Sequence, residues 1–574
     1  MNTSLQTIDY IIILLYFIVV GSYGYWIYKK KQKATLDTKD FFLAEGSLTW
    51  WAIGASLIAS NISAEQFIGM SGDGFFVGIA VAAYEWIAAI ALIIIAVYFI
   101  PIYLKNKIYT MPQFLKQRYN ETVALIMAIF WLFLYIFVNL TSILYLGAVA
   151  INGLLGGEYL HILMIILAFC ALIITLGGMK VIGYTDVIQV AVLIIGGLAT
   201  TYFALTIVSE KFGLGRDVLA GFNALLQDSP EHFKLMLDKP AVNVATITDP
   251  LNTEIQKYVI LPGIAMYFAG QWIVHLNYWG CNQYITQRAL GADLTTARNG
   301  ILFAGFLKLM MPIIVMLPGI AAWVLYKNGH LPEMSGGKDG AYSAILAFLP
   351  QGLKGLSIAA LTAAIVASLA GKLNSISTIY TLDIHKRFFD KEATEKKMVW
   401  VGRMTVVVAL LVSILFTWND TLGIGGEGGF TFIQKYTGFI SPGIFALFIL
   451  GFFWKRTTGT AAIVGILTGF LMSVFFNSFA VDIFGKETLL YTAYQYEKLI
   501  DGNVQTIVEI PFLISMGWSF FFTVSLMVIV SLAGPKVNPK ALDLDASMFK
   551  LKPATIALIV ITLMIIGALY ARFW

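Results

Sequence analysis

The residues best placed to do chemistry in this sequence are polar side chains inside long apolar segments. Asn61 and Gln66 fall in the middle of an apolar run that begins near Trp50, and Glu85 falls about midway along the next run. A charged side chain at the centre of a bilayer is costly unless it meets a partner or water. This pattern favours a binding site for a polar solute over two purely structural membrane helices.

Small and polar residues around Asn61 also indicate that the first of these segments is interrupted. A helix can break inside a membrane only where protein or a water-filled cavity satisfies the freed N–H and C=O groups. A second interruption is expected at 275–283, where the sequence HLNYWGCNQ divides another apolar run. Two broken helices, with carbonyls for a cation and side chains for a solute, are typical of cation-coupled secondary transporters.

The composition indicates a polytopic membrane protein. Of the 574 residues, 59% are hydrophobic and 12% are charged, and the mean hydropathy is +0.80. These values exclude a disordered chain and an ordinary soluble multidomain protein. Cys170 and Cys281 lie in apolar segments, so core packing is expected for them rather than a disulfide. No catalytic, metal or nucleotide motif is present, and nothing supports an enzyme or nucleic-acid binding.

Long apolar runs predict an all-α integral membrane protein with fourteen spans. Basic residues gather in the loops after the third, ninth and eleventh spans, which the positive-inside rule assigns to the cytoplasm. This distribution predicts a multi-pass protein of the plasma (cell inner) membrane with both termini outside. The spans are expected near 8–28, 48–70, 74–100, 121–152, 158–177, 181–208, 258–282, 300–326, 353–383, 398–417, 428–453, 458–481, 509–533 and 553–573.

The order of the spans predicts a single transporter domain over 1–574 with a five-plus-five inverted repeat. The polar segments 209–257 and 482–508 are expected to be external loops with short helices. The predicted parts are an extra first helix and inner loop at 1–47, a first repeat at 48–208, an outer loop at 209–257, a second repeat at 258–457, and three additional helices at 458–574.

Several motifs, read together, resemble the sodium/glucose cotransporter branch of the solute:sodium symporter family, and most of all bacterial sodium/galactose transporters. The resemblance covers nearly the whole chain and is weakest in the outer loops and the last three spans. It implies Na⁺-coupled symport of a monosaccharide by alternating access, with Na⁺, a sugar and the lipid bilayer as partners. The motifs are NISAEQFIGMSG, YEWIAAI, LYIFVNLTSILYLG, YTDVIQV, NYWGCNQYITQR, LNSISTIYTLDI and FIQKYTGFISPGIFALFILGFFWK.

The resemblance implies a sugar site of charged and amide side chains, which suit the many donors and acceptors of a neutral polyol. His275 and Ala88 differ from the residue types usual at these positions, so the preferred hydroxyl pattern stays open. The alternatives are a structural ion pair between Glu85 and Lys308, and a Gln434 amide that only satisfies a kinked backbone. The implied sugar-binding residues are Asn61, Gln66, Glu85, His275, Lys308 and Gln434.

Gates above and below the sugar are also implied by the resemblance. An aromatic side chain would stack under the sugar on the inner side, and a lid would close over it on the outer side. Plain core packing is the alternative for these aromatics. The implied gate residues are Tyr278 on the inner side, Met70, Tyr84 and Phe430 on the outer side, and Trp279.

The resemblance further implies a Na⁺ site at the first broken helix. Its ligands would be the carbonyls of Ala59, Ile62 and Ala364 and the hydroxyl of Ser368. Ala367 stands where the family usually has another serine, so one of the oxygen ligands that a hard cation prefers is missing.

Lys372 follows Ser368 by four positions and is therefore expected on the same face of its helix, where an ammonium needs a counter-charge. The resemblance points to Asp186 as the neighbour and to Gly371 as the place of a missing second-site hydroxyl. We expect Lys372 to pair with Asp186, to take the place of a second cation and to fix coupling at one Na⁺ per sugar. The alternative is that Lys372 extends toward the interface while Asp186 is hydrated or pairs with Lys180.

Two other functions remain possible at this point. One is a Na⁺ symporter for another small solute, such as inositol, a carboxylate or an amino acid. Glu85 argues against an anion because the two charges would repel. The other is a substrate-gated channel or sensor that does not transport.

Overall fold

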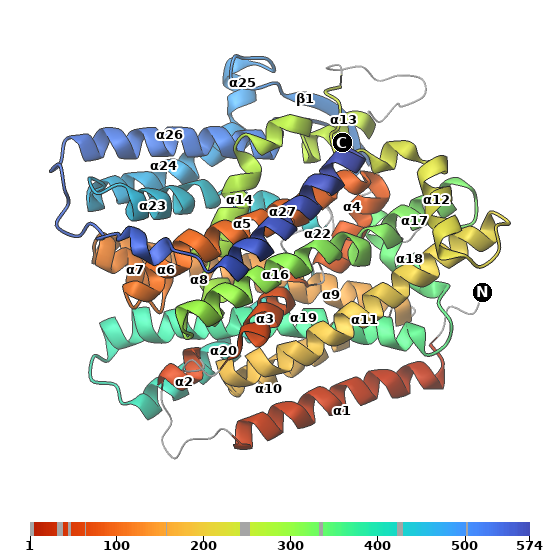
Figure 1. The fold of residues 1–574 in the computed structure, drawn as a ribbon, viewed down its shortest axis with the longest axis horizontal. Helices are drawn as coiled ribbons and strands as arrows, with labels where there is room; N and C mark the ends of the chain where they lie inside the picture. The colour runs from red at the N-terminus through yellow and green to blue at the C-terminus, as the bar shows by residue number, and fades with distance from the viewer. Residues whose placement is uncertain are drawn as a thin grey trace.

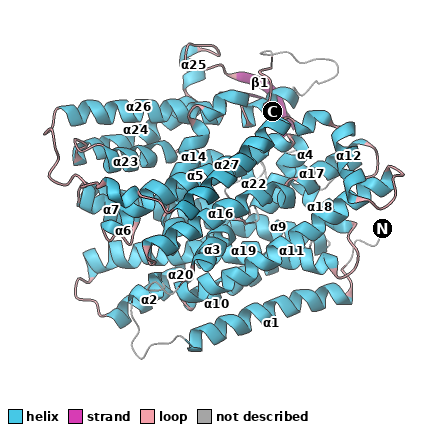
Figure 2. Cartoon of the chain, in the orientation of Figure 1, coloured by secondary structure: helices cyan, strands magenta, loops and turns pink. Residues whose placement is uncertain are grey.

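The computed structural model describes residues 5–30, 38–43, 48–63, 65–155, 158–240, 253–331, 337–421, 429–500 and 503–574. These residues are almost entirely helical (Figure 2). In the first half the helices are α1 (Thr7–Lys30), α2 (Thr38–Leu43), α3 (Trp50–Asn61), η2 (Glu65–Met70), α4 (Ser71–Phe76), η3 (Ile79–Val81), α5 (Ala82–Ile94), η4 (Ile95–Phe99), α6 (Ile100–Lys105), α7 (Met111–Arg118), α8 (Glu121–Phe133), η5 (Leu134–Leu140), α9 (Thr141–Leu155), α10 (Leu160–Leu176), α11 (Met179–Lys211), α12 (Val218–Asp228), η6 (Pro230–Phe233), α13 (Thr253–Ile260), η7 (Gly263–Tyr267) and α14 (Gly270–Cys281).

The second half continues in the same style and adds one pair of strands. Its elements are α15 (Gln283–Leu290), α16 (Leu294–Val315), α17 (Leu317–Lys327), η8 (Gly337–Gly340), α18 (Ala341–Ala347), α19 (Leu353–Thr378), η9 (Ile379–Phe389), α20 (Glu395–Thr417), α22 (Gly429–Gly438), α23 (Ser441–Phe453), α24 (Gly459–Ser478), α25 (Ala480–Phe484), β1 (Tyr494–Ile500), β2 (Asn503–Glu509), α26 (Phe512–Leu532), η10 (Ala546–Phe549) and α27 (Pro553–Phe573).

The long helices lie side by side as one bundle (Figure 1). α1 lies along one edge, and α24 packs on α26 at the opposite edge. Between them, α3 contacts α11, α16 and α19. α3 and α16 approach closely because each presents a glycine there: a Cβ on Gly54 would lie 2.7 Å from the Gly300 carbonyl oxygen. The first broken helix is therefore surrounded by protein.

The predicted interruption after Asn61 is confirmed. Thr49 caps the start of α3 by accepting a hydrogen bond from Ala52 N, and the helix ends at Asn61 because Ile62 is extended, with φ −79° and ψ 117°. The chain continues as the π-helix η2 and then as α4. The Ser368 hydroxyl of α19 donates to the Ser60 carbonyl oxygen at this end, at 3.1 Å. A protein side chain thus satisfies a backbone group near the break.

The second predicted interruption is also present. α14 ends at Cys281, Asn282 is extended with φ −96° and ψ 130°, and α15 begins at Gln283. The Tyr135 hydroxyl of η5 accepts a hydrogen bond from the freed Gln283 N at 3.2 Å and donates to Asn282 Oδ1 at the same distance. Tyr135 therefore provides the polar partner that a break inside a membrane requires.

The predicted number of fourteen spans is not confirmed. Within the described residues, ten helices are long and apolar enough to cross a membrane, or eleven if the bent pair Thr253–Tyr267 and Gly270–Cys281 forms one span. Each predicted span coincides with helical residues, but several are divided at breaks or are short. α10 has 17 residues and α23 has 13. Apolar length in the sequence therefore does not show whether one continuous helix crosses.

The segment 482–508 is not the loop with short helices that its sequence suggested. It contains an antiparallel hairpin in which β1 pairs with β2, with Tyr494 opposite Glu509. Tyr494 and Tyr496, two positions apart, both pack against Tyr258 and its buried neighbours. This period of two is what a strand with one buried face requires. In 209–257 the described residues do include the short helices α12 and η6.

Candidate functional site

A cavity lies between the two broken helices and is lined by every side chain assigned to the sugar site. α3 and η2 contribute Asn61 and Gln66, and α5 contributes Glu85. The remaining three come from α14, α16 and α22, and they are His275, Lys308 and Gln434. Residues up to 373 positions apart in the sequence, from Asn61 to Gln434, thus surround one space.

The centre of this cavity wall is a buried ion pair with an amide beside it. Lys308 Nζ donates to Glu85 Oε2 at 2.6 Å, and Gln66 Nε2 donates to Glu85 Oε1 at 3.0 Å. All three side chains are buried. Lys308 Nζ also lies 5.3 Å from the centroid of the Trp279 ring, so its charge has a second favourable neighbour. The pair offers a solute both acceptors and donors while its net charge is zero.

His275 lines the same cavity and is fixed by its own helix. Its Nε2 bonds Gln271 Oε1 at 2.9 Å, one turn earlier on α14. The Tyr84 ring meets the His275 ring edge-on at a centroid distance of 5.9 Å. Ala88, one turn after Tyr84 on α5, lines the same wall. The two departures from the family pattern, His275 and Ala88, therefore both face the cavity.

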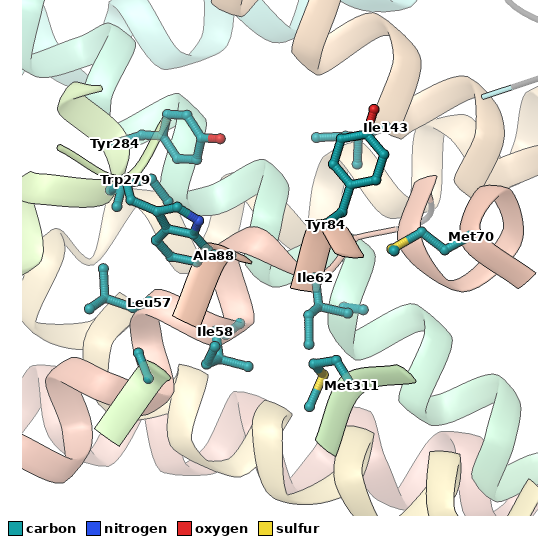
Figure 3. Packing of buried hydrophobic residues seen from close by; sticks show 14 of the residues in the cluster. Leu57, Ile58, Ile62, Met70, Tyr84, Ala88, Ile143, Trp279, Tyr284 and Met311 are labelled. Carbon is teal, nitrogen blue, oxygen red and sulfur yellow. The ribbon is translucent and has the colours of Figure 1, made fainter. Parts of the chain in front are cut away.

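Tyr278, assigned to the inner gate, and Trp279, also assigned to a gate, lie at the second break. Tyr278 packs edge-on against Trp279 and Tyr284, and its hydroxyl accepts a hydrogen bond from Asn61 Nδ2 at 3.0 Å. This bond joins the two broken helices directly. Trp279, Tyr284 and Ala88 lie together in Figure 3.

The side chains of two of the three residues assigned to the outer gate are described, and both are buried. Tyr84 lines the cavity, whereas Met70 does not reach it and packs in the apolar core (Figure 3). The Phe430 side chain lies outside the described residues.

Of the residues assigned to Na⁺, Ala59 and Ile62 lie at the first break, and Ser368 of α19 contacts it. Ala59, Ile62, Ala364 and Ser368 are all buried, and the Ser368–Ser60 hydrogen bond brings α19 against the end of α3. The Ser63 hydroxyl is also buried here and makes no hydrogen bond among the described residues. An extra unpartnered oxygen at this break fits a hard cation, which binds carbonyl and hydroxyl oxygens.

The expected pairing of Asp186 with Lys372 is wrong. Asp186 accepts a hydrogen bond from the Ser56 hydroxyl, and its cation is Arg288, with Nη2 at 3.8 Å from Oδ2. Lys372 instead donates to Ser368 Oγ at 3.0 Å. The reason is packing: a Cβ on Gly371 would lie 2.5 Å from Arg288 Nη2, so the glycine makes room for the guanidinium.

Arg288 is the main functional candidate that the sequence analysis missed. Its Nε donates to Ser56 Oγ at 2.6 Å, and its other nitrogens bond Ser60 Oγ and the Tyr284 carbonyl oxygen. It thus ties α15, which follows the second break, to α3, which precedes the first break. The available signal was an arginine five positions after the predicted interruption at 275–283, in NYWGCNQYITQR, which received no role.

Comparison with known proteins agrees with this geometry. Residues 41–469 match the model of the sodium:solute symporter family. The sodium/glucose cotransporter of Vibrio parahaemolyticus is 38% identical, over 100% of this chain and 99% of that protein. The human sodium/myo-inositol cotransporter 2 is 33% identical, over 82% of this chain and 70% of that protein.

A solved structure has the same fold. It is the substrate-bound outward-open state of a Na⁺-coupled sialic acid symporter, with a TM-score of 0.75 over 94% of this chain and 100% of that one. The sequence identity is 19%, so this likeness concerns the fold.

The helical bundle, the two breaks and the polar cavity between them define a multi-pass membrane transporter, and the relatives are transporters rather than enzymes. The chain belongs to the sodium:solute symporter family, which confirms the resemblance seen in its motifs, and it uses Na⁺ to drive symport of a small solute.

Proposed function

We propose that this protein is a Na⁺-driven monosaccharide symporter that takes up a hexose such as glucose or galactose by alternating access. The observation that carries this proposal is the Lys308–Glu85–Gln66 cluster in the cavity wall. Its carboxylate, ammonium and amide can bond several sugar hydroxyls, and the neutral ion pair does not demand a charged solute. The similarity to a bacterial sodium/glucose cotransporter supports the same substrate class.

A second candidate substrate is an inositol. It is a cyclic polyol with the same kind of hydroxyl groups, and several relatives are sodium/myo-inositol cotransporters at 33% identity. A carboxylate or amino acid is less well matched, since Glu85 would repel an anion and Lys308 is already neutralised by Glu85.

We place the transport cycle on a five-plus-five inverted repeat, 48–208 and 258–457, with 1–47, 209–257 and 458–574 as additions. In this arrangement the two breaks occupy equivalent positions in the two repeats, as in transporters of this architecture. The positive-inside distribution of basic residues supports a plasma-membrane orientation with both termini outside.

Coupling is proposed at one Na⁺ per sugar, held by the carbonyls of Ala59, Ile62 and Ala364 and by the Ser368 hydroxyl. The support is that Asp186 already has a fixed cation, Arg288. One Na⁺ moving through about 100 mV gains roughly 2.3 kcal/mol, and a tenfold gradient adds about 1.4 kcal/mol. Together they would support accumulation of a neutral solute on the order of 500-fold.

The test is uptake by purified protein in liposomes. Labelled glucose, galactose, myo-inositol, an amino acid and a carboxylate are offered separately under an inward Na⁺ gradient or a matched K⁺ gradient. We expect concentrative, Na⁺-dependent uptake of a hexose, which a Na⁺ ionophore abolishes. Preferred inositol uptake would establish the second candidate, and sugar binding without accumulation would indicate a channel or sensor.

A further inference from the structure

Lys372 connects the proposed cation site to the sugar cavity. It lies on α19, one turn after Ser368, and is 2% exposed. Its ammonium donates to Ser368 Oγ at 3.0 Å, and its side chain also lines the cavity that holds Glu85 and Lys308. One side chain therefore contacts both places where solutes are proposed to bind.

The hydrogen bonds of Ser368 determine what Lys372 does at the cation site. The hydroxyl has one proton, which it donates to the Ser60 carbonyl oxygen at the first break. The lone pairs of the oxygen remain as acceptors, and the Lys372 ammonium donates a hydrogen bond to one of them. The Ser368 hydroxyl, which would ligate Na⁺, thus already accepts a hydrogen bond from a positively charged group.

A Na⁺ on Ser368 Oγ and an ammonium bonded to the same oxygen would lie only a few ångströms apart. Two like charges at that separation repel strongly in a buried site, where water screens them little. Asp186 does not offset this repulsion through an ion pair with Lys372, since Arg288 is its partner. The two cations therefore compete for this oxygen.

The structure also provides a place for the displaced ammonium. Lys372 Nζ lies 4.8 Å from the centroid of the Tyr284 ring, and Tyr284 lines the sugar cavity as well. A lysine has a flexible four-carbon stem, so rotation can move its head group along this wall while the ring continues to stabilise its charge. In the cavity the ammonium meets a solute's hydroxyl groups as a donor.

We infer that Lys372 is the resident cation of the Na⁺ site: its ammonium holds Ser368 Oγ until Na⁺ binds, then moves into the cavity and donates to the sugar. Na⁺ binding and sugar binding are coupled through this exchange, because both favour the position in which the Lys372 ammonium lies in the cavity. The inference rests on the proposed Na⁺/sugar function.

The test uses the full-length protein with Lys372→Met, which keeps the length of the side chain and removes its charge. Na⁺ binding without sugar is followed by intrinsic tryptophan fluorescence in detergent, and sugar binding is measured with and without Na⁺. We expect Lys372→Met to lower the half-saturating Na⁺ concentration by about tenfold, because the competing charge is gone. The ratio of sugar affinities with and without Na⁺ should fall to near one.

The matched control is Lys354→Met, which removes a buried lysine from the same helix 18 positions away. It should leave Na⁺ half-saturation unchanged. Lys372→Arg keeps the charge and should retain the coupling, which a lysine with only a packing role would not require. Adding Ser368→Ala to Lys372→Met should abolish the gain in Na⁺ affinity.

An unchanged or higher half-saturating Na⁺ concentration in Lys372→Met would overturn the inference. If that variant does not fold, Lys372→Gln gives the same comparison. Failure of the proposed function is separable: it appears as wild-type protein without Na⁺-dependent sugar uptake, whereas failure of this inference alone leaves wild-type uptake Na⁺-dependent.

Discussion

At the scale of single residues, the Glu85 carboxylate has one donor on each oxygen, Lys308 on Oε2 and Gln66 on Oε1. Truncating either donor removes a hydrogen bond to a charged group, of about 1.5 to 3 kcal/mol. We expect Lys308→Ala and Gln66→Ala each to lower sugar uptake by about tenfold or more. Liposome uptake measures this effect, and unchanged uptake in both variants would contradict the site.

Folding has to be measured in the same variants, because loss of Lys308 leaves the Glu85 charge buried without its cation. The matched control is Glu85→Gln, which keeps one acceptor and removes the charge. It should reduce uptake less than Glu85→Ala. Thermal unfolding of the purified proteins separates a transport defect from a folding defect.

The Na⁺ site gives a second prediction at this scale, since Ser368 supplies a hydroxyl and the preceding Ala367 supplies none. Ala367→Ser should lower the Na⁺ concentration for half-maximal uptake by restoring an oxygen ligand, and Ser368→Ala should raise it. Uptake as a function of Na⁺ concentration tests both changes. If the added hydroxyl has no effect, the cation binds elsewhere or the position is already filled.

Some of these residues could be identified from the sequence and others could not. Glu85 and Gln66 stand out as polar groups within apolar runs, whereas the contact of Lys308 with Glu85 joins positions 223 apart and was reached only through the resemblance. The partner of Asp186 was predicted wrongly because the choice between Lys372 and Arg288 depends on the space beside Gly371, which only the packed structure shows.

At the scale of elements, both helix breaks could be predicted because small and polar residues interrupt apolar runs at Asn61 and before Gln283. The hairpin at β1 and β2 was missed because its tyrosines acquire a buried face only by packing on α13. The local sequence pattern therefore located the interruptions in the membrane helices. The formation of the β1–β2 hairpin, in contrast, depends on tertiary contacts.

The second part of the first broken helix, α4, is held by a contact that gives a third prediction. Lys338 of η8 donates to Asp73 Oδ1 of α4. Burial disfavours the charged form of the lysine, but the carboxylates of Asp73 and Asp339 hold the pKa of Lys338 above its ordinary value. Asp73 is 1% exposed, and its Oδ2 has no hydrogen-bond partner among the described residues.

Loss of the lysine from this pair should reduce stability more than loss of the aspartate charge. Lys338→Met leaves a buried carboxylate without its cation, whereas Asp73→Asn leaves a lysine that can reach solvent. We expect Lys338→Met to lower thermal stability more than Asp73→Asn, by a difference of about 1 to 3 kcal/mol. The double variant should be no less stable than Lys338→Met. Equal losses in the two single variants would show that η8 is held by other contacts.

At the scale of the whole molecule, apolar length identified an all-helical membrane bundle but not the number of continuous helices that cross it. Spans that are broken for function, such as α3 with η2 and α4, divide into short pieces in the structure. The composition that makes them break is the same composition that carries the binding groups. One source of the lower number of continuous helices is therefore an element that lines the candidate site, and the short helices α10 and α23 are another.

Stoichiometry is the property of the whole molecule that the Arg288–Asp186 pair predicts. A guanidinium fixed beside Asp186 by Ser56, Ser60 and the Tyr284 carbonyl leaves that carboxylate paired within the protein. We therefore expect one elementary charge to move with each sugar.

The reversal potential of sugar flux in liposomes, set by opposing Na⁺ and sugar gradients, measures this ratio of charge to sugar without depending on the transport rate. With one Na⁺ the limiting accumulation is about 500-fold at about 100 mV and a tenfold Na⁺ gradient, and with two it is about 250,000-fold. A measured ratio of two would mean that a second Na⁺ binds despite Arg288, and the role assigned to this arginine would then be wrong.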